Sequence, residues 1–165
     1  LLGKERELLS EIEMKKLSNL GSLLLMSLIA MQSYAQDIVM DASTQGRIVY
    51  TNGGQFSDSG RDGDSYSNFE ENTMTLCSST GESVSLDFES FNLENKKDFL
   101  YVYDEMDVSA FEVEGSPFTG HSAEDKVLTS SGNCLTFRIK TDFNVKRSGW
   151  LADVSVNDLP MVTKN

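Results

Sequence analysis

Two carboxylates and two lysines share one short loop near the middle of this 165-residue chain. Glu94 and Asp98 bracket the loop, and Lys96 and Lys97 lie between them. Carboxylates attract cations and also pair with basic side chains. Strand-like segments flank the loop on both sides, so it is a place where a binding site could sit.

Residues that commonly catalyse reactions are sparse in the chain. His121 is the only histidine, and it lies in a loop rich in Gly, Ser, Glu and Asp. Neither a Gly-x-Ser-x-Gly nucleophile motif nor a His-Glu-x-x-His zinc motif accompanies it. We therefore interpret His121 as a solvated side chain and expect no enzymatic activity.

Cys77 and Cys134 are the only cysteines. Both lie in the part of the chain that we expect to be exported, where an oxidising compartment favours their pairing. Such a bridge would stabilise the fold by roughly 4 kcal/mol at most. We expect one intramolecular disulfide, and two independent free thiols are the alternative.

The elements that must position these residues are short strands. Val84, Leu86 and Phe88 alternate with polar residues, which is typical of a strand with one buried face. Residues 53–68 are dense in Gly, Ser and Asp and are expected to form a long surface loop. Further strands are expected at residues 47–51, 72–76, 98–104, 110–113, 126–129, 134–140 and 149–156.

No segment after residue 36 repeats apolar residues at helical spacing for three turns. Short strands separated by close turn signals are typical of a sandwich or barrel. Trp150 and the alternating apolar positions are enough to fill a core between two sheets. The sequence therefore predicts an all-β domain, an antiparallel two-sheet β-sandwich with no helix longer than two turns.

Residues 14–35 have the pattern of a cleaved signal peptide. Two lysines open the segment, an apolar stretch follows, and Ser33 and Ala35 are small residues where a signal peptidase reads the chain. The apolar run is shorter than the roughly 20 residues that cross a bilayer. We expect cleavage near Gln36 and a secreted or cell-surface protein, extracellular or periplasmic, with no membrane insertion after cleavage.

The remaining boundaries follow from this signal. Residues 1–13 contain no Met, so we interpret them as read-through upstream of the true start. Residues 36–45 are expected to be a loose leader, residues 46–157 the domain, and residues 158–165 a tail or linker. The natural protein could continue beyond residue 165.

The chain is acidic, with a formal net charge of −12. Residues 1–35 carry equal numbers of acidic and basic residues, so the charge stays with the exported part. Such a charge repels nucleic acids and anionic membranes and favours cations or basic protein surfaces. We expect no nucleic-acid partner.

The order of these landmarks resembles the CUB domain, a secreted β-sandwich with jelly-roll topology. The Asp-Ser-Gly loop at residues 58–60 and Trp150 after a glycine look most like the bacterial, exported branch of the family. The resemblance covers residues 47–156. The segments that carry it are Gly-Gln-Phe-Ser-Asp-Ser-Gly at 54–60 with Tyr66, Met-Thr-Leu at 74–76 leading to 84–94, 98–104, and 135–142 running to Ser-Gly-Trp at 148–150.

The resemblance implies a calcium site at one end of the sandwich. The family's carboxylate positions correspond to Glu94, Asp98 and Asp142, with Asn144 as a nearby polar ligand and Tyr66 as a supporting tyrosine. Calcium takes six to eight oxygen ligands, and clustered carboxylates repel one another without a cation. We expect the Asp98 side chain to face a loop, so that Asp98→Ala spares the metal-free fold.

Two features depart from the family pattern. The loop between Glu94 and Asp98 is short, and its Lys96 and Lys97 could neutralise the carboxylates without any metal. The family's usual cysteines are absent, so the pairing of Cys77 with Cys134 rests on the compartment alone.

The resemblance implies a non-catalytic module that binds a protein, through a basic residue at the contact, or a glycan. The alternative is a metal-independent carbohydrate-binding module of a secreted enzyme or adhesin. That function would use exposed aromatic side chains, for which the candidates are Phe99, Tyr101, Tyr103, Phe118 and Phe143.

Overall fold

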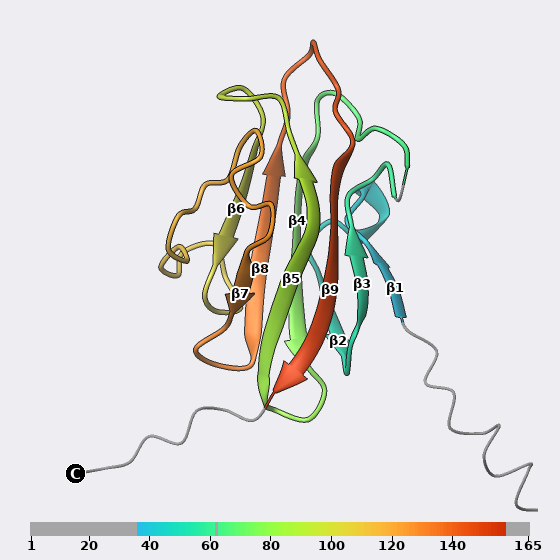
Figure 1. Ribbon diagram of the computed structural model, residues 1–165. Coiled ribbons are helices and arrows are strands. Elements are labelled where there is room, and N and C mark those ends of the chain that lie inside the picture. Colours follow the sequence, from blue (N-terminus) through green and yellow to red (C-terminus); the bar gives the residue numbers. More distant parts are fainter. Residues whose placement is uncertain (1–35, 62, 158–165) are drawn as a thin grey trace, which may run out of the picture. The chain divides into compact units, whose positions relative to one another are not determined.

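The computed structural model describes residues 36–61 and 63–157, and its strands form two β-sheets (Figure 1). Among these residues the first sheet has five strands and the second has four. In order across the first sheet they are β1 (Gln36–Val39), β3 (Gly54–Ser57), β9 (Gly149–Asn157), β5 (Ser83–Asn92) and β7 (Val127–Thr129). Across the second they are β2 (Arg47–Thr51), β4 (Glu71–Ser78), β8 (Cys134–Lys140) and β6 (Phe99–Tyr103).

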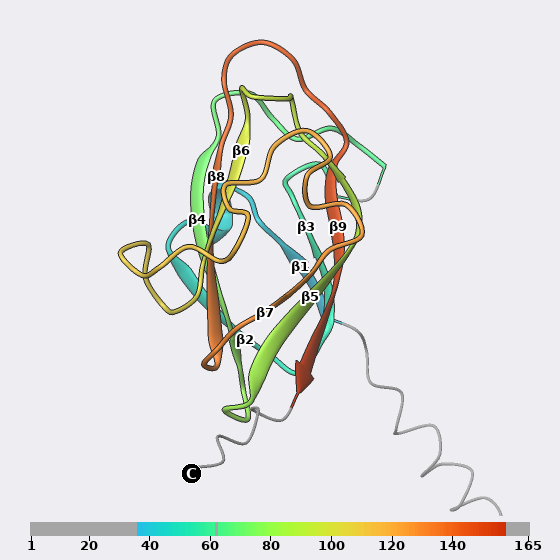
Figure 2. The ribbon, with the colours of Figure 1, turned by 60° about the vertical axis from the view of Figure 1, so that its left-hand side comes forward.

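The two sheets pack face to face, which confirms the predicted β-sandwich. Figure 2 shows β4, β8 and β6 in one layer and β3, β9 and β5 in the other. The one helix of the described residues is the short 3-10 helix η1 (Ala42–Thr44), and none there is long and apolar enough to cross a membrane.

The pairing is antiparallel except at one edge of each sheet. β1 pairs with β3 in parallel, and β2 pairs with β4 in parallel. The chain crosses to the second sheet for β2 and returns for β3, so β3 runs in the same direction as β1. The predicted antiparallel sandwich is therefore mixed at these two edges, where the structure adds one parallel pair to each sheet.

Aromatic rings from both sheets fill the core. Phe56 of β3 lies 4.8 Å from Phe137 of β8 and 5.6 Å from Trp150 of β9, measured between ring centroids. All three side chains are almost completely buried. The buried face predicted for β5 is confirmed, because Val84, Leu86 and Phe88 have no exposed surface. On the opposite face Asp87 and Glu89 are exposed as expected, but Ser85 is buried.

Three segments differ from the sequence expectations. Residues 36–45 are not a loose leader, because β1 pairs with β3 and Met40 is fully buried. Residues 53–68 include β3 as well as a loop, since its Gly-rich start hid a strand of only four residues. Residues 110–113 form no strand and make only an isolated bridge between Glu112 and Tyr103.

The predicted disulfide is confirmed. Cys77 and Cys134 face each other directly in the antiparallel pair of β4 and β8, and a bond joins their sulfurs. Both residues are buried, and the bond links β4 to β8 at the last residue pair of their ladder.

A buried aspartate ties the end of β3 to the start of β9. Asp58 Oδ2 accepts a hydrogen bond from Trp150 N at 2.6 Å, and Oδ1 accepts one from Gly60 N at 2.7 Å. Gly149 is essential to this contact, because a Cβ built there would lie 1.6 Å from Asp58 Oδ2. Its φ of +71° is also one that side-chain-bearing residues rarely adopt.

Gly149→Ala should therefore lower the free energy of unfolding by about 3 kcal/mol or more, since it adds a steric overlap with a buried carboxylate to backbone strain. The matched control is Gly46→Ala. Gly46 has nearly the same φ, +69°, but a Cβ added there would meet nothing within 4 Å. The control should lose only about 1 kcal/mol. Urea denaturation measures both changes, and equal losses would contradict the role assigned to Asp58.

Asp58 should also make stability depend on pH. Burial raises the pKa of its carboxyl from 3.8 to about 6, although its hydrogen bonds with the Trp150 and Gly60 amides oppose the shift. Because the folded-state pKa is the higher one, this group favours folding most below pH 3.8, and the contribution is lost as the pH rises through 6. The free energy of unfolding of the wild type minus that of Asp58→Asn should fall by about 2–3 kcal/mol across this window. A flat or rising difference would contradict the prediction.

Candidate functional site

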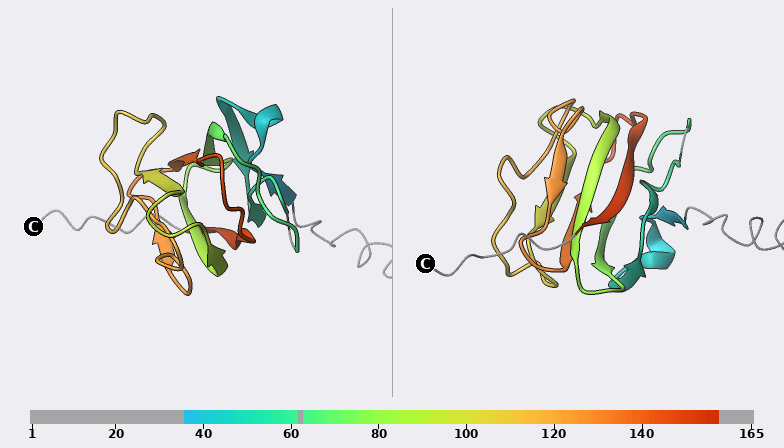
Figure 3. Two further views of the ribbon diagram at one scale, coloured as in Figure 1. Left: turned by 90° about the horizontal axis from the view of Figure 1, so that it is seen from above. Right: turned by 60° about the horizontal axis from the view of Figure 1, so that its bottom comes forward.

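Three carboxylates meet at one end of the sandwich, which Figure 3 shows from above. Glu94 lies just beyond β5, Asp98 immediately precedes β6, and Asp142 follows β8. β6 and β8 pair antiparallel, with Phe99 opposite Lys140, so the start of one strand lies beside the end of the other. Sheet pairing therefore places Asp98 next to Asp142, and the loop after β5 brings Glu94 from the opposite sheet.

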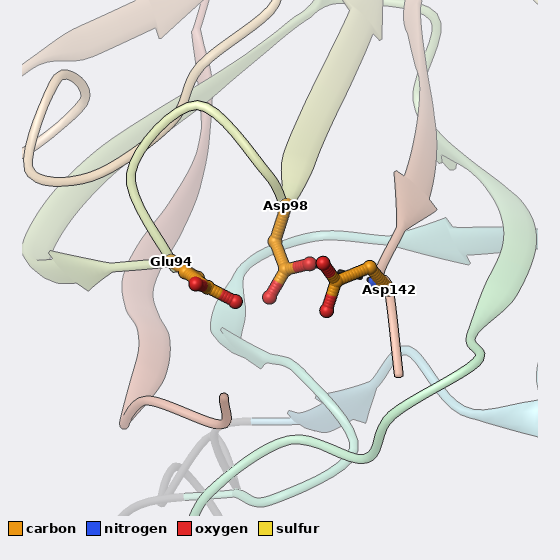
Figure 4. A group of neighbouring side chains, drawn as sticks. All are labelled: Glu94, Asp98 and Asp142. Atoms are coloured by element: carbon orange, nitrogen blue, oxygen red, sulfur yellow. Dashed lines mark hydrogen bonds between the residues drawn. The ribbon is translucent and has the colours of Figure 1, made fainter. Parts of the chain in front are cut away.

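The side chains of these residues point toward one another (Figure 4). One carboxylate oxygen from each lies within 4.8 Å of the others. The structure thus brings together all three acidic residues that the sequence grouped as calcium ligands.

Asp98 is the centre of a hydrogen-bond network. Its Oδ1 accepts from Asp142 N at 2.8 Å, and its Oδ2 accepts from the Tyr66 hydroxyl at 2.5 Å. The Tyr66 hydroxyl accepts in turn from Glu94 N at 3.0 Å. Burial, helped by the bond to Asp98, raises the pKa of Tyr66 well above its usual value, so this phenol remains a neutral donor.

Asp98 faces the loop residues Tyr66 and Asp142, as expected, but the expectation that Asp98→Ala would spare the metal-free fold was wrong. The residue is 1% exposed and serves two donors. Asp98→Ala would leave the buried Tyr66 hydroxyl without its acceptor, so the substitution would also destabilise the metal-free fold.

Glu94 keeps an oxygen free for a ligand. Its Oε2 is buried and has no hydrogen-bond partner. The ion pairs among the described residues are Arg61–Asp37, His121–Glu124 and Arg138–Glu71, so neither Lys96 nor Lys97 pairs with the acid cluster. Both lysines are exposed, and the Lys96 backbone N–H donates to Thr119 Oγ1 at 2.7 Å. The lysines therefore do not neutralise the carboxylates as the sequence alternative suggested.

The donor set fits calcium. Calcium binds oxygen at about 2.3–2.6 Å, so two ligands of one ion lie up to about 5 Å apart. The 4.8 Å limit on the three carboxylate oxygens matches this span. Asn144, the fourth ligand implied by the resemblance, is exposed and contacts Asp142 Oδ1 through its backbone N–H at 2.8 Å.

The aromatic candidates for glycan binding divide between core and surface. Phe118 is fully buried and Tyr103 is 7% exposed, whereas Phe99 and Tyr101 are half-buried. Phe143 alone of the five is well exposed. The set is therefore not a continuous aromatic platform.

Two residues beside the acid cluster escaped the sequence analysis. Asn68 Nδ2 donates to the carbonyl oxygens of Phe143 and Asn144, and Phe69 N donates to the carbonyl oxygen of Asp142. They lie more than 70 positions before their partners. Sequence spacing does not predict contacts between residues so far apart. The only signal for Asn68 and Phe69 is that they lie in, or next to, a long polar loop.

No curated protein matches this chain significantly by sequence. Solved structures do resemble it, including the CUB1-EGF-CUB2 domains of rat MASP-1, with a TM-score of 0.53 and 25% identity over 68% of this chain and 43% of that one. The MASP-1 CUB2 domain bound to Ca2+ gives a TM-score of 0.56 and 17% identity over 68% of this chain and 99% of that one.

The extracellular region of zebrafish Gpr126/Adgrg6 gives a TM-score of 0.55 and 20% identity over 66% of this chain, which spans 14% of that protein's chain. The family model of the CUB domain matches residues 46–153. The sandwich, the segments that form it and this match agree, and the chain belongs to the CUB domain family, whose domains generally act as protein-interaction modules.

Proposed function

We propose that this chain is an exported module that binds a protein partner through the end of the sandwich bearing Glu94, Asp98 and Asp142, with calcium at that cluster. The observation that carries the proposal is the convergence of three carboxylates, one of which has a buried oxygen without a partner. The calcium named for the MASP-1 CUB2 structure supports the same assignment by fold analogy.

Electrostatics favours a cation at this cluster. Carboxylates within 4.8 Å of one another repel, and desolvation of the buried Asp98 strengthens that repulsion. Calcium would supply two positive charges and would join the β5–β6 loop, which carries Glu94 and Asp98, to the β8–β9 loop, which carries Asp142. The Tyr66 hydroxyl and the Asp142 amide hold the Asp98 carboxylate in place, and the same hydroxyl anchors the backbone of Glu94.

The partner's contact group should be basic. Three carboxylates around one divalent ion keep a net negative charge, and the chain as a whole carries −12. A lysine or arginine side chain would complement this charge. A glycan partner has less support, because the aromatic residues that the sequence offered for it are mostly buried or half-buried.

Export is part of the proposal. The buried Cys77–Cys134 disulfide is typical of oxidising compartments, which supports passage through a secretory route. The signal-peptide segment, residues 14–35, lies outside the described residues. Expression of the full chain in a secreting host should release a product whose first residue is near Gln36. N-terminal sequencing of that product is the measurement, and retention of residues 14–35 would refute cleavage.

Calcium binding is tested by isothermal titration calorimetry and thermal unfolding. We expect one site in the wild type, and calcium at about 100 times its Kd should stabilise the fold by roughly 2.7 kcal/mol. Glu94→Gln should weaken binding by at least about tenfold, because it removes a charged ligand that has no other partner at Oε2.

The matched control is Glu89→Gln, an exposed position of β5 that should bind calcium as the wild type does. Glu94 is a better test than Asp98, whose loss would also disturb the metal-free fold. If millimolar calcium gives neither heat nor a rise in Tm with the wild type, the calcium part of the proposal is wrong.

A further inference from the structure

Two exposed phenylalanines lie together beside the acid cluster. Phe69 is 78% exposed and Phe143 is 68% exposed, and their rings stack with centroids 6.4 Å apart and an interplanar angle of 26°. Burial of one such side chain is worth about 1.5–3 kcal/mol. A pair left in water therefore offers a favourable contact to any apolar group that reaches it.

The backbone holds this pair in place. Phe69 N donates to Asp142 O at 2.9 Å, and Asn68 Nδ2 donates to Phe143 O at 2.9 Å. Thr141 strengthens the junction, because its hydroxyl donates to Ser67 O at 3.0 Å. The two aromatic side chains are thus carried by segments tied to each other and to the acid cluster.

Phe69 has an unusual backbone. Its φ is +59°, a conformation that costs a side-chain-bearing residue about 1–2 kcal/mol. A core residue can offset such strain through packing, but the Phe69 ring lies mostly in solvent. Strain at an exposed aromatic residue points to a contact made outside the chain.

The pair and the acid cluster are directly connected. The main chain of Asp142 holds Phe69 while its carboxylate faces Glu94 and Asp98, and Phe143 is the next residue. Two neighbouring side chains of a partner could therefore reach an apolar contact and a negative one together.

We propose that Phe69 and Phe143 form an apolar contact that selects partner proteins in which a leucine, methionine or aromatic residue lies within two positions of the lysine or arginine bound at the acid cluster. This inference rests on the proposed function and specifies its partner. A protein segment suits the pair better than a sugar, because phenylalanine has no polar tip and Asn68 Nδ2 is already engaged by two carbonyl oxygens.

The test uses an array of synthetic peptides in a Gly-Ser frame. One position holds lysine, arginine or norleucine, and the two positions on either side hold leucine, methionine, phenylalanine or serine. The folded, disulfide-bonded protein is applied with millimolar calcium or with EDTA.

We compare the wild type with Phe69→Ala/Phe143→Ala and with Phe111→Ala. Phe111 is a matched control because it is 92% exposed and its carbonyl contacts Asp104, beyond the other end of β6.

The wild type should prefer peptides that combine a basic and an apolar residue. The double variant should bind these about tenfold more weakly, should bind lysine–serine peptides unchanged, and should keep the calcium affinity of the wild type. The Phe111 variant should match the wild type throughout.

Equal binding of lysine–leucine and lysine–serine peptides by the wild type would overturn the aromatic contact and leave the proposed function standing. Binding that ignores lysine and arginine, or no binding at all, would overturn both. The same proteins are also tested on a panel of neutral oligosaccharides. If the wild type binds an oligosaccharide and the double variant does not, the two phenylalanines contact a sugar and the peptide proposal is wrong.

Discussion

The hydrogen bonds made by the buried carboxylate of Asp98 determine the geometry of the candidate site. A carboxylate away from water is costly unless donors surround it. Here the Tyr66 hydroxyl and the Asp142 amide supply those donors, and the same hydroxyl also receives the amide of Glu94. Loops that begin in both sheets are thereby fixed to one side chain. These hydrogen bonds lie entirely within the chain, and they position the Asp98 carboxylate and the backbones of Glu94 and Asp142 for a ligand of the acid cluster.

The packing of the two sheets stabilises the fold enough for the loops to contain residues in strained backbone conformations. Trp150, Phe56 and Phe137 join the two sheets, and the disulfide closes the end of the second sheet. Stability therefore resides in the strands, and the loops can keep the positive φ values of Phe69 and Lys96. Both residues lie beside the acid cluster and both are exposed, which is where local strain is usually retained for binding.

The alternation of polar and apolar residues predicted the strands that have one buried face, and it missed the short strands that lack this alternation. Val84, Leu86 and Phe88 were identified because polar residues separate them. β1 is a short edge strand that pairs in parallel with the equally short β3, and the Gly53–Gly54 pair where β3 begins is typical of a turn. The resemblance grouped Glu94, Asp98 and Asp142 correctly in space, but no pattern shows that Asp98 is buried. Phe69 could not be predicted because its contact with Asp142 joins distant loops.

Asp58 and the acid cluster show why one buried carboxylate is structural while others can bind a ligand. Both oxygens of Asp58 accept backbone amides, and the approach to Oδ2 is so close that only the hydrogen of Gly149 fits there. No space remains for an ion. At the cluster, Glu94 retains an unpaired oxygen that faces two further carboxylates. An unpaired oxygen beside two further carboxylates, rather than burial or charge alone, distinguishes the acid cluster from Asp58, and it supports our proposal that the Glu94 end of the network binds the ligand.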